Sequence, residues 1–530
     1  MKKLIVTAAA FLAFAAPASR AQQSMAGILA DYDGELRESV RRADGVLHVD
    51  TPAMIAKLKS LHITTYVYLV WHAATDWDDL CNEFLPAAAQ AGIDVWVYLV
   101  PPSECTPACS LPFGDDYVQW GAQIGQLSLR YPQLKAWAID DFNSNLKTFT
   151  RDYVRQMTQA AKAVNPQLQF LPLMYFAQIS TAFLDSYAGN IDGIIMAYRD
   201  DPHPNTQVSA TLAPQLDSLI GLMQPYGRTL ILMIYASALS HTPLPPSAEY
   251  VADTVRTGLS YLRAGLIGGV VTYVLPLGNQ PDPNSLNPAH SGLGFAACSV
   301  LGGTHTSPGD YAAVGTDAAI DPMAGQYSLT FWQMHTFAGG ASLPGYHFKQ
   351  VLVNGQVIWE RDVADSSPDQ WMQETVDLTA MLSQQTSAQI SFRILDKKGV
   401  SSYYATTRFD DAIGSGVALP DPGFESPDSW TAEATQPGLL AGIGIFDANR
   451  PQESFRAVQE QYGPHRLLFL AMALGDQALI DGAGQILNAF LSGDKIAAAS
   501  AADSLAQAAG DRGDSVLSEQ ATLVAADLRN

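Results

Sequence analysis

The chain has 530 residues, of which 48% are hydrophobic and 15% are charged, and its formal net charge at pH 7 is −22. This length exceeds one ordinary core and predicts two or three folded domains, and the composition excludes a disordered chain. The acidic balance argues against nucleic acid or anionic lipid as a partner, because both are themselves negatively charged.

The first 21 residues have the three parts of a secretory signal: a lysine pair, an apolar stretch over 4–18, and a small-residue site ending at Ala21. We expect cleavage after Ala21 and an exported protein, periplasmic or extracellular. The segment holds three basic and no acidic residues, so its removal takes the net charge to −25. No later segment offers about 18 unbroken apolar residues, so membrane insertion is not expected.

Between residues 22 and 280, apolar runs alternate with stretches of helical spacing. The first strand is expected at 27–33, with 45–50 as a competing candidate. Seven more strands are expected at 66–71, 95–100, 135–139, 170–176, 193–198, 229–235 and 269–275. Their near-continuous apolar character is typical of strands buried on both faces. The repeat predicts an α/β fold, a (β/α)₈ TIM barrel.

Beyond the barrel, the pattern changes twice. Residues 281–305 have the Pro, Asn, Gly and Ser content of a linker, and residues 306–420 read as short alternating strands. The Asn354-Gly355 pair predicts a hairpin turn. We therefore expect a β-sandwich, jelly-roll-like, that either binds glycan or braces the barrel. Residues 421–530 are expected to form a linker and a small helical C-terminal region.

Four cysteines are present. Cys105 and Cys109 lie close together in an expected exported chain, which predicts a local disulfide. Zinc is the competing interpretation, but no CxxC or HxxxH spacing accompanies the pair, so no metal is expected. Cys81 and Cys298 are predicted either to pair with each other or to be buried thiols.

Asp140 and Asp141 follow the apolar run of the fourth strand. Catalytic groups of (β/α)₈ barrels lie at the C-terminal ends of the strands. Two neighbouring carboxylates cannot both ionise easily, so one is kept protonated near neutral pH and supplies a general acid. Such a pair is the minimal equipment for cleaving a glycosidic bond. The structural alternative is a helix cap or calcium ligand beside a solvated aspartate.

Aromatic residues end several of the expected strands. They are Trp71, Tyr175, Tyr198, Tyr235 and Tyr273. These rings either cap the barrel core or stack on a sugar, and the two roles are compatible. A neutral carbohydrate is therefore the expected partner, and no cofactor is expected.

The Ile-Asp-Asp-Phe ending of the fourth strand resembles the paired aspartates of glycoside hydrolase family 84, the O-GlcNAcase and bacterial hyaluronidase group. The segment 191–200, Ile-Asp-Gly-Ile-Ile-Met-Ala-Tyr-Arg-Asp, resembles the sixth strand of family 18 chitinases. The resemblance implies a barrel in which the substrate's own N-acetyl group is the nucleophile. It implies that Asp140 orients the acetamido group, Asp141 protonates the leaving oxygen, Tyr198 holds the acetamido oxygen and Asp200 supports the site.

Two alternatives stay open. One uses no acetamido group: retaining α-glycosidases with this barrel have a fourth-strand aspartate as nucleophile and a sixth-strand aspartate as acid, and Asp140 or Asp141 with Asp200 or Asp201 would fit. The other alternative is a barrel that binds glycan without catalysis, because fold does not fix function. Further candidates for contact with a substrate are Glu104, Asn143, Arg199 and His203, although a histidine in such a loop is more often exposed and idle. The sequence predicts no oligomeric state.

Overall fold

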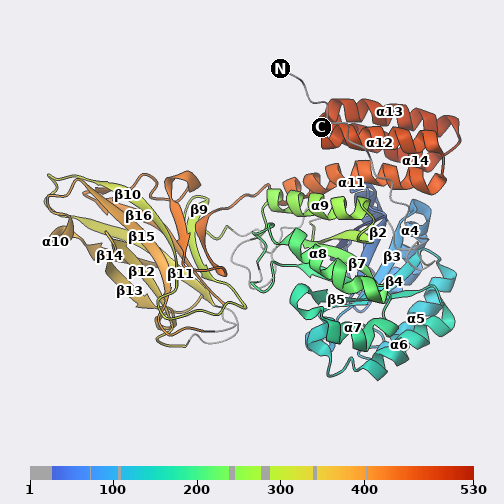
Figure 1. Cartoon of the computed structure of the whole chain (residues 1–530), viewed down its shortest axis with the longest axis horizontal. Coiled ribbons are helices and arrows are strands. Elements are labelled where there is room, and N and C mark those ends of the chain that lie inside the picture. The colour runs from blue at the N-terminus through green and yellow to red at the C-terminus, as the bar shows by residue number, and fades with distance from the viewer. Residues whose placement is uncertain are drawn as a thin grey trace, which may run out of the picture.

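The computed structural model describes residues 27–71, 73–105, 109–203, 205–237, 245–275, 287–337, 343–400 and 404–529, so the expected signal segment lies outside the described residues. Within them, eight parallel strands close into a barrel in chain order, which confirms the predicted fold (Figure 1). The strands are β1 (Ile28–Asp33), β2 (Thr65–Val70), β3 (Asp94–Leu99), β4 (Leu134–Ile139), β5 (Gln169–Tyr175), β6 (Gly193–Tyr198), β7 (Thr229–Tyr235) and β8 (Gly269–Tyr273). The competing segment 45–50 adds no barrel strand.

Helices follow the barrel strands. They are α2 (Thr51–Ser60), α3 (Asp76–Asp79), a π-helical turn (Leu80–Phe84), α4 (Leu85–Ala91), α5 (Tyr117–Arg130), α6 (Arg151–Val164), α7 (Thr181–Tyr187), α8 (Leu212–Met223) and α9 (Ala248–Arg263). Several start at a residue whose side chain accepts a backbone N–H of the first turn, as Asp116, Thr150 and Ser247 do. Such caps satisfy N–H groups that have no partner inside the helix.

The helix that covers β8 and β1 comes from much later in the chain. It is α11 (Arg450–Leu474), which lies beside α9 (Figure 1). Its Gln461 amide donates to the Ala252 carbonyl of α9 at 2.9 Å. The Tyr462 hydroxyl is buried against the barrel wall, 3.1 Å from the Ala30 carbonyl and 3.2 Å from the Val270 carbonyl. The eighth helix of the barrel is therefore α11.

Three more helices pack on the far side of α11. They are α12 (Gln477–Leu491), α13 (Lys495–Asp511) and α14 (Ser515–Arg529), and together with α11 they enclose a core of alanine, leucine and valine. Gly463 of α11 faces α14 so closely that a Cβ there would lie 3.0 Å from the Val524 side chain. His62 of the barrel pairs with Asp527 at 2.7 Å. The helical region is thus tied to the barrel and covers its α11 side.

Between β8 and α11 lie two antiparallel sheets. One has the order β13, β12, β15, β10, β17, with β18 also paired to β10, and the other has the order β14, β11, β16, β9, β19. The strands are β9 (Gly294–Val300), β10 (Tyr311–Ile320), β11 (Ser328–Phe337), β12 (His347–Val353), β13 (Gln356–Asp362), β14 (Met372–Asp377), β15 (Ser387–Asp396), β16 (Ala405–Ser415), β17 (Val417–Ala418), β18 (Thr431–Ala434) and β19 (Leu439–Ile445), with a short helix α10 (Thr379–Leu382).

Aromatic residues of both sheets meet in one core, where the rings of Phe331 and Phe392 lie 5.7 Å apart. The expected hairpin joins β12 and β13, and Asn354 and Gly355 both have positive φ (49° and 78°). That is the backbone a two-residue hairpin turn requires. The sandwich begins at β9, inside the stretch expected as a linker, and continues past residue 420 to β19.

The order of domains along the chain therefore differs from the expected order of barrel, linker, sandwich and helical region. The sandwich is inserted between the last strand and the last helix of the barrel. The physical reason is that β8 and β1 need a helix on their outer face, and α11 supplies it. Among the described residues, no helix combines the length and the apolar character that a membrane crossing requires.

Candidate active site

Alternate residues of the barrel strands point into the barrel, where they form one core cluster. Five tyrosines of this inner set lie at the C-terminal ends of their strands: Tyr32, Tyr98, Tyr175, Tyr235 and Tyr273. The ring of Tyr32 lies 4.6 Å from that of Tyr98 and 5.0 Å from that of Tyr273, and Tyr235 lies 4.7 Å from Tyr273. We call this end of the barrel the mouth.

Asp140 belongs to the mouth. It continues the inward series of Ala136 and Ala138 on β4, and its backbone N–H donates to the Leu99 carbonyl at 3.1 Å. Burial, followed by the charges of Glu104 and Asp141, raises the pKa of the Asp140 carboxyl to about 7, although its contact with the Tyr98 hydroxyl acts in the opposite direction. Asp140 is therefore a carboxyl group that carries a proton in much of the neutral range.

Asp141 sits in a strained position directly after β4. Its φ is 38°, in the left-handed region, and its N–H donates to Asp140 Oδ1 at 2.8 Å. Asp141 Oδ1 is buried, and it has no hydrogen-bond partner within the described part of the chain. Strained backbone of this kind is common at functional sites. Asn143 follows in the same short turn and is half-buried.

Glu104 approaches the aspartates from the loop after β3. The charge of Asp141 and burial both raise the pKa of the Glu104 carboxyl, burial being the larger cause. Asn145 ties the two loops together, because its amide donates to Ser103 Oγ at 2.9 Å and to the Asp141 carbonyl at 3.0 Å. The next residue after Glu104 is Cys105, which forms the predicted disulfide with Cys109, whereas Cys81 and Cys298 are free thiols.

Arg199, the residue directly after β6, brings a cation to the mouth. It follows the inward residues Ile195 and Ala197, and its guanidinium lies over the Tyr175 ring, 3.5 Å from the centroid. Its Nε donates to Asp201 Oδ1 at 2.7 Å. Asp201 Oδ2 in turn accepts the N–H of Ala177 at 3.1 Å. The guanidinium is therefore held in one orientation by a ring and a carboxylate.

Two candidates do not join this group. Tyr198 points to the outer side of the barrel wall, where its hydroxyl donates to the Val208 carbonyl at 2.7 Å. Asp200 has a φ of 56° and is bound by Asn205 Nδ2 at 2.6 Å and by the Thr211 hydroxyl. Both serve the β6–α8 loop. For Tyr198 the reason is strand parity, because the even-numbered residues of β6 face the helices, whereas Asp200 lies beyond the end of the strand.

Trp71 is half-buried against the inner cluster, at the end of β2. Its backbone N–H donates to Asp76 Oδ2 at 3.0 Å, and the same oxygen accepts the N–H of Ala73 at 2.8 Å. Asp76 is also paired with Arg37 at 2.7 Å. The position of the Trp71 loop thus depends on a buried carboxylate.

Glu35 belongs to the same buried group. Its Oε1 accepts the N–H of Leu69 at 2.9 Å, and Arg37 lies 3.4 Å from its Oε2. Burial and the charge of Asp76 raise the pKa of the Glu35 carboxyl to about 8. In the unfolded chain, the same group would titrate near its ordinary value of about 4.3.

This difference predicts a pH effect on stability. Between about pH 4.5 and 8 the folded state keeps a proton on Glu35 that the unfolded state has lost, so the free energy of unfolding falls as pH rises. We expect Glu35→Gln to reduce that fall by a few kcal/mol, since glutamine keeps the acceptor for Leu69 without the titration. Urea unfolding at pH 5, 7 and 8.5 measures it, with Asp152→Asn as an exposed control. Parallel pH curves for Glu35→Gln and wild type would contradict the prediction.

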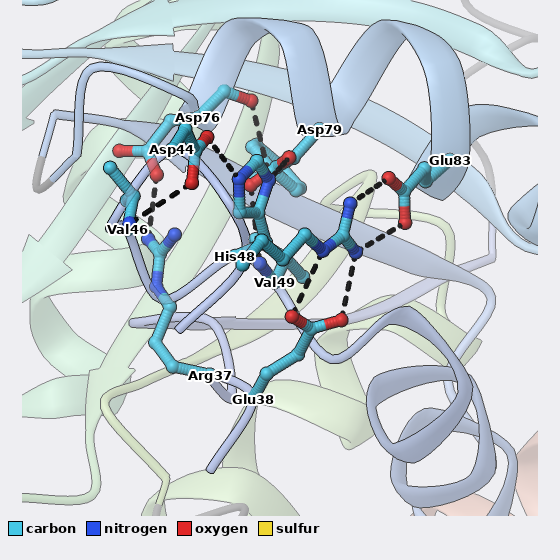
Figure 2. Close-up of polar contacts among 11 residues, drawn as sticks. Arg37, Glu38, Asp44, Val46, His48, Val49, Asp76, Asp79 and Glu83 are labelled. Atoms are coloured by element: carbon cyan, nitrogen blue, oxygen red, sulfur yellow. Dashed lines mark hydrogen bonds and ion pairs between the residues drawn. The ribbon is translucent and has the colours of Figure 1, made fainter. Parts of the chain in front are cut away.

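Figure 2 shows a second polar group, which lies beside the Arg37–Asp76 pair. Ligand atoms of His48, Asp79 and Glu83 lie within 4.8 Å of one another, as in a metal site. Each has a protein partner: His48 lies 2.6 Å from Asp79 and 2.8 Å from Asp44, and Arg42 pairs with Glu83 at 2.5 Å. A metal ion would have to displace Arg42, so the geometry is that of an ion-pair network that fixes the loop after β1.

Sequence reasoning missed Tyr32, Tyr98, Asn145 and Glu35. Tyr32 and Tyr98 carry only the signal that each is an aromatic residue near a strand end, and the structure shows that each faces inward. Asn145 and Glu35 carry none, since their roles depend on partners, Ser103 and Leu69, in other barrel units. The structure brings Asp140, Asp141 and Glu104 close together. The charges of Glu104 and Asp141 raise the pKa of Asp140, and the charge of Asp141 raises the pKa of Glu104.

The molecule is thus a (β/α)₈ barrel with clustered carboxyl groups at its mouth. No protein-family model matches the chain, and no curated protein matches it. Solved structures with a similar fold include a β-glucuronidase from an uncultured Clostridium sp., at 13% identity and a TM-score of 0.33, over 46% of this chain and 43% of that one. A glucosidase from Croceicoccus marinus matches at 9% identity and 0.35, over 70% and 96%.

The endoglucanase Cel5A from Pseudomonas stutzeri matches at 12% identity and a TM-score of 0.32, over 47% of this chain and 84% of that one. The chain thus spans less than half the length of the β-glucuronidase. Likeness of this degree carries no argument about the reaction. The particular resemblance to families 84 and 18 is not shown by these matches.

Proposed function

We propose that the protein is an exported glycoside hydrolase that acts on an oligosaccharide or polysaccharide at the mouth. The observation that carries the proposal is the Asp140 carboxyl, whose pKa burial and neighbouring charges raise to about 7, beside Asp141 and Glu104 at the ends of barrel strands. A proton donor next to a second carboxylate is what glycosidic cleavage needs.

Asp140 is the better candidate for the proton donor, whereas the family resemblance gave that role to Asp141. A donor must hold its proton at working pH, and burial provides this for Asp140. Asp140 then protonates the leaving oxygen while the bond from that oxygen to the sugar carbon breaks. Asp141, with its buried Oδ1, either polarises a substrate acetamido group that attacks the sugar carbon or attacks that carbon itself. In both cases water then attacks the sugar carbon, the bond from that carbon to Asp141 or to the acetamido oxygen breaks, and Asp140 takes the proton of the water and is restored.

The aromatic lining supports a sugar substrate. Tyrosine rings offer flat apolar faces to the carbon–hydrogen faces of a sugar and hydroxyls to its oxygen atoms. Trp71, Tyr175, Tyr235 and Tyr273 remain candidates for such contacts, and Tyr32 and Tyr98 join them. Glu104, Asn143 and Arg199 are candidates for polar contacts. Tyr198 and Asp200 are assigned to support of the β6–α8 loop.

A screen on aryl glycosides, with and without a 2-acetamido group, tests the proposal. We expect turnover of at least one glycoside, with kcat/KM falling as pH rises through about 7, because deprotonated Asp140 cannot act as donor. Absence of turnover across the panel, in a folded protein that still binds glycan, would favour a non-catalytic barrel.

The same active glycoside distinguishes the two roles of Asp141. Strong inhibition by a thiazoline that mimics the cyclised intermediate indicates acetamido participation, because the enzyme stabilises that state over the substrate. Covalent labelling of Asp141 by a fluorosugar, without thiazoline inhibition, indicates a carboxylate nucleophile. If the fluorosugar labels Asp141 and substitution of Asp201 shows that Asp201 is the required acid, the α-glycosidase-like alternative is favoured.

A further inference from the structure

The β6–α8 loop is held by its own side chains. The N–H of Asn205 donates to the Arg199 carbonyl at 2.9 Å, and its side-chain amide donates to Asp200 Oδ2 at 2.6 Å. The Thr211 hydroxyl donates to the other oxygen of Asp200, and Gln215 donates to the Asp201 carbonyl at 3.0 Å. These bonds link residues of the loop from Arg199 to Thr211 to one another.

One residue of this loop contacts the sandwich. His203 Nδ1 lies 3.2 Å from the Thr304 hydroxyl, and that hydroxyl lies 3.0 Å from the Gly438 carbonyl. Gly438 has a φ of 88°, and a Cβ there would overlap Thr304 Oγ1 and lie 2.6 Å from His203 Nδ1. The three residues are therefore in close contact, although about a hundred residues or more separate them in the chain.

The hydrogen atoms in this contact can be assigned. A hydroxyl has one proton, and the carbonyl of Gly438 is only an acceptor, so Thr304 donates to it. The Thr304 oxygen then accepts from His203, whose Nδ1 must carry a hydrogen. The histidine is also held from its backbone side, because its N–H donates to the Asp200 carbonyl at 3.1 Å and its carbonyl accepts from Asn205 at 2.9 Å.

We propose that the sandwich positions the mouth of the barrel: His203, held by Thr304 and Gly438, fixes the β6–α8 loop and thereby the Arg199–Asp201 pair over Tyr175. His203 is a positioning residue and not a catalytic one. The insertion of the sandwich between β8 and α11 explains how it reaches this end of the barrel, since β8 ends there. The consequence for catalysis rests on the proposed function, whereas the contact itself does not.

Hydrogen exchange of the full chain tests the contact without any substrate. In Gly438→Ala, the added Cβ collides with Thr304 and His203, and we expect amides of 199–211 to exchange about tenfold faster. Gly355→Ala is the matched control, because Gly355 has a similar φ of 78° with nothing within 4 Å of its Cβ position. It should leave 199–211 unchanged. Unchanged exchange in Gly438→Ala would overturn the contact.

Kinetics on an active glycoside test the consequence. We expect His203→Ala to raise KM by about tenfold, since Arg199 loses its fixed orientation. The value of kcat and the loss of activity as pH rises through about 7 should be retained, because Asp140 is untouched. His203→Asn should restore KM, as its amide supplies a donor near the Nδ1 position. Loosened exchange with unchanged KM would overturn the positioning role. A wild-type protein inactive on every glycoside would refute the proposed function and leave the exchange result to decide the contact.

Discussion

Asp140→Asn should lower kcat/KM on a natural glycoside by about 10²–10⁴-fold, the usual contribution of a general acid. The amide cannot give up a proton to the leaving oxygen. The same variant should retain much of its activity on a dinitrophenyl glycoside, because that leaving group departs without protonation. Asp141→Asn should instead lose activity on both substrates, since its carboxylate acts on the sugar carbon or on the acetamido group.

The comparison needs evidence that both variants are folded. Asp140→Asn removes a carboxyl whose pKa is raised by folding, so it should unfold at no lower temperature than wild type above pH 7. Asp152→Asn, an exposed aspartate on α6, is the control for an ordinary Asp-to-Asn change. Wild-type turnover in folded Asp140→Asn and Asp141→Asn would remove both residues from the mechanism.

A protein truncated after residue 286 should aggregate, whereas a protein that lacks only residues 287–445 should stay soluble. Truncation removes α11 and leaves the outer faces of β8 and β1 in water. Val458 and Tyr462 of α11 are fully buried in the barrel's outer core. Each such side chain contributes about 1.5–3 kcal/mol by burial, against about 5–15 kcal/mol for a whole domain. Deletion of the sandwich alone keeps α11 on the barrel.

Size-exclusion chromatography and thermal unfolding of the two shortened proteins measure this difference. Tyr462→Ala in the full chain is the point variant for the same contact, and it should cost about 3–5 kcal/mol, as large-to-small changes of buried aromatic residues do. A soluble protein that ends at residue 286 and unfolds cooperatively would show that α11 is dispensable.

The inserted sandwich also affects the activity expected of a protein from which it has been deleted. If the sandwich positions the β6–α8 loop, the protein without residues 287–445 should fold but bind substrate weakly. Folding and activity then depend on different parts of the same C-terminal half, α11 for folding and the sandwich for the mouth.

The barrel and the position of Asp140 were predictable from the sequence. Strands such as Gly193–Tyr198 and Thr229–Tyr235 are apolar throughout, and their spacing by helical stretches is a local, repeated pattern. Asp140 stands where such a run ends, and the ends of parallel strands meet at one face. These features depend on neighbours in the chain, so periodicity records them.

Tertiary structure alone decided which way Tyr198 points, what α11 covers and what His203 touches. A strand buried on both faces is apolar at every position, so its sequence does not state which parity faces inward. The roles of α11 and His203 depend on contacts with Val270 and Thr304, which lie far away in the chain and become neighbours only in the folded protein. The raised pKa of Asp140 likewise comes from burial beside Glu104, a residue of the preceding barrel unit.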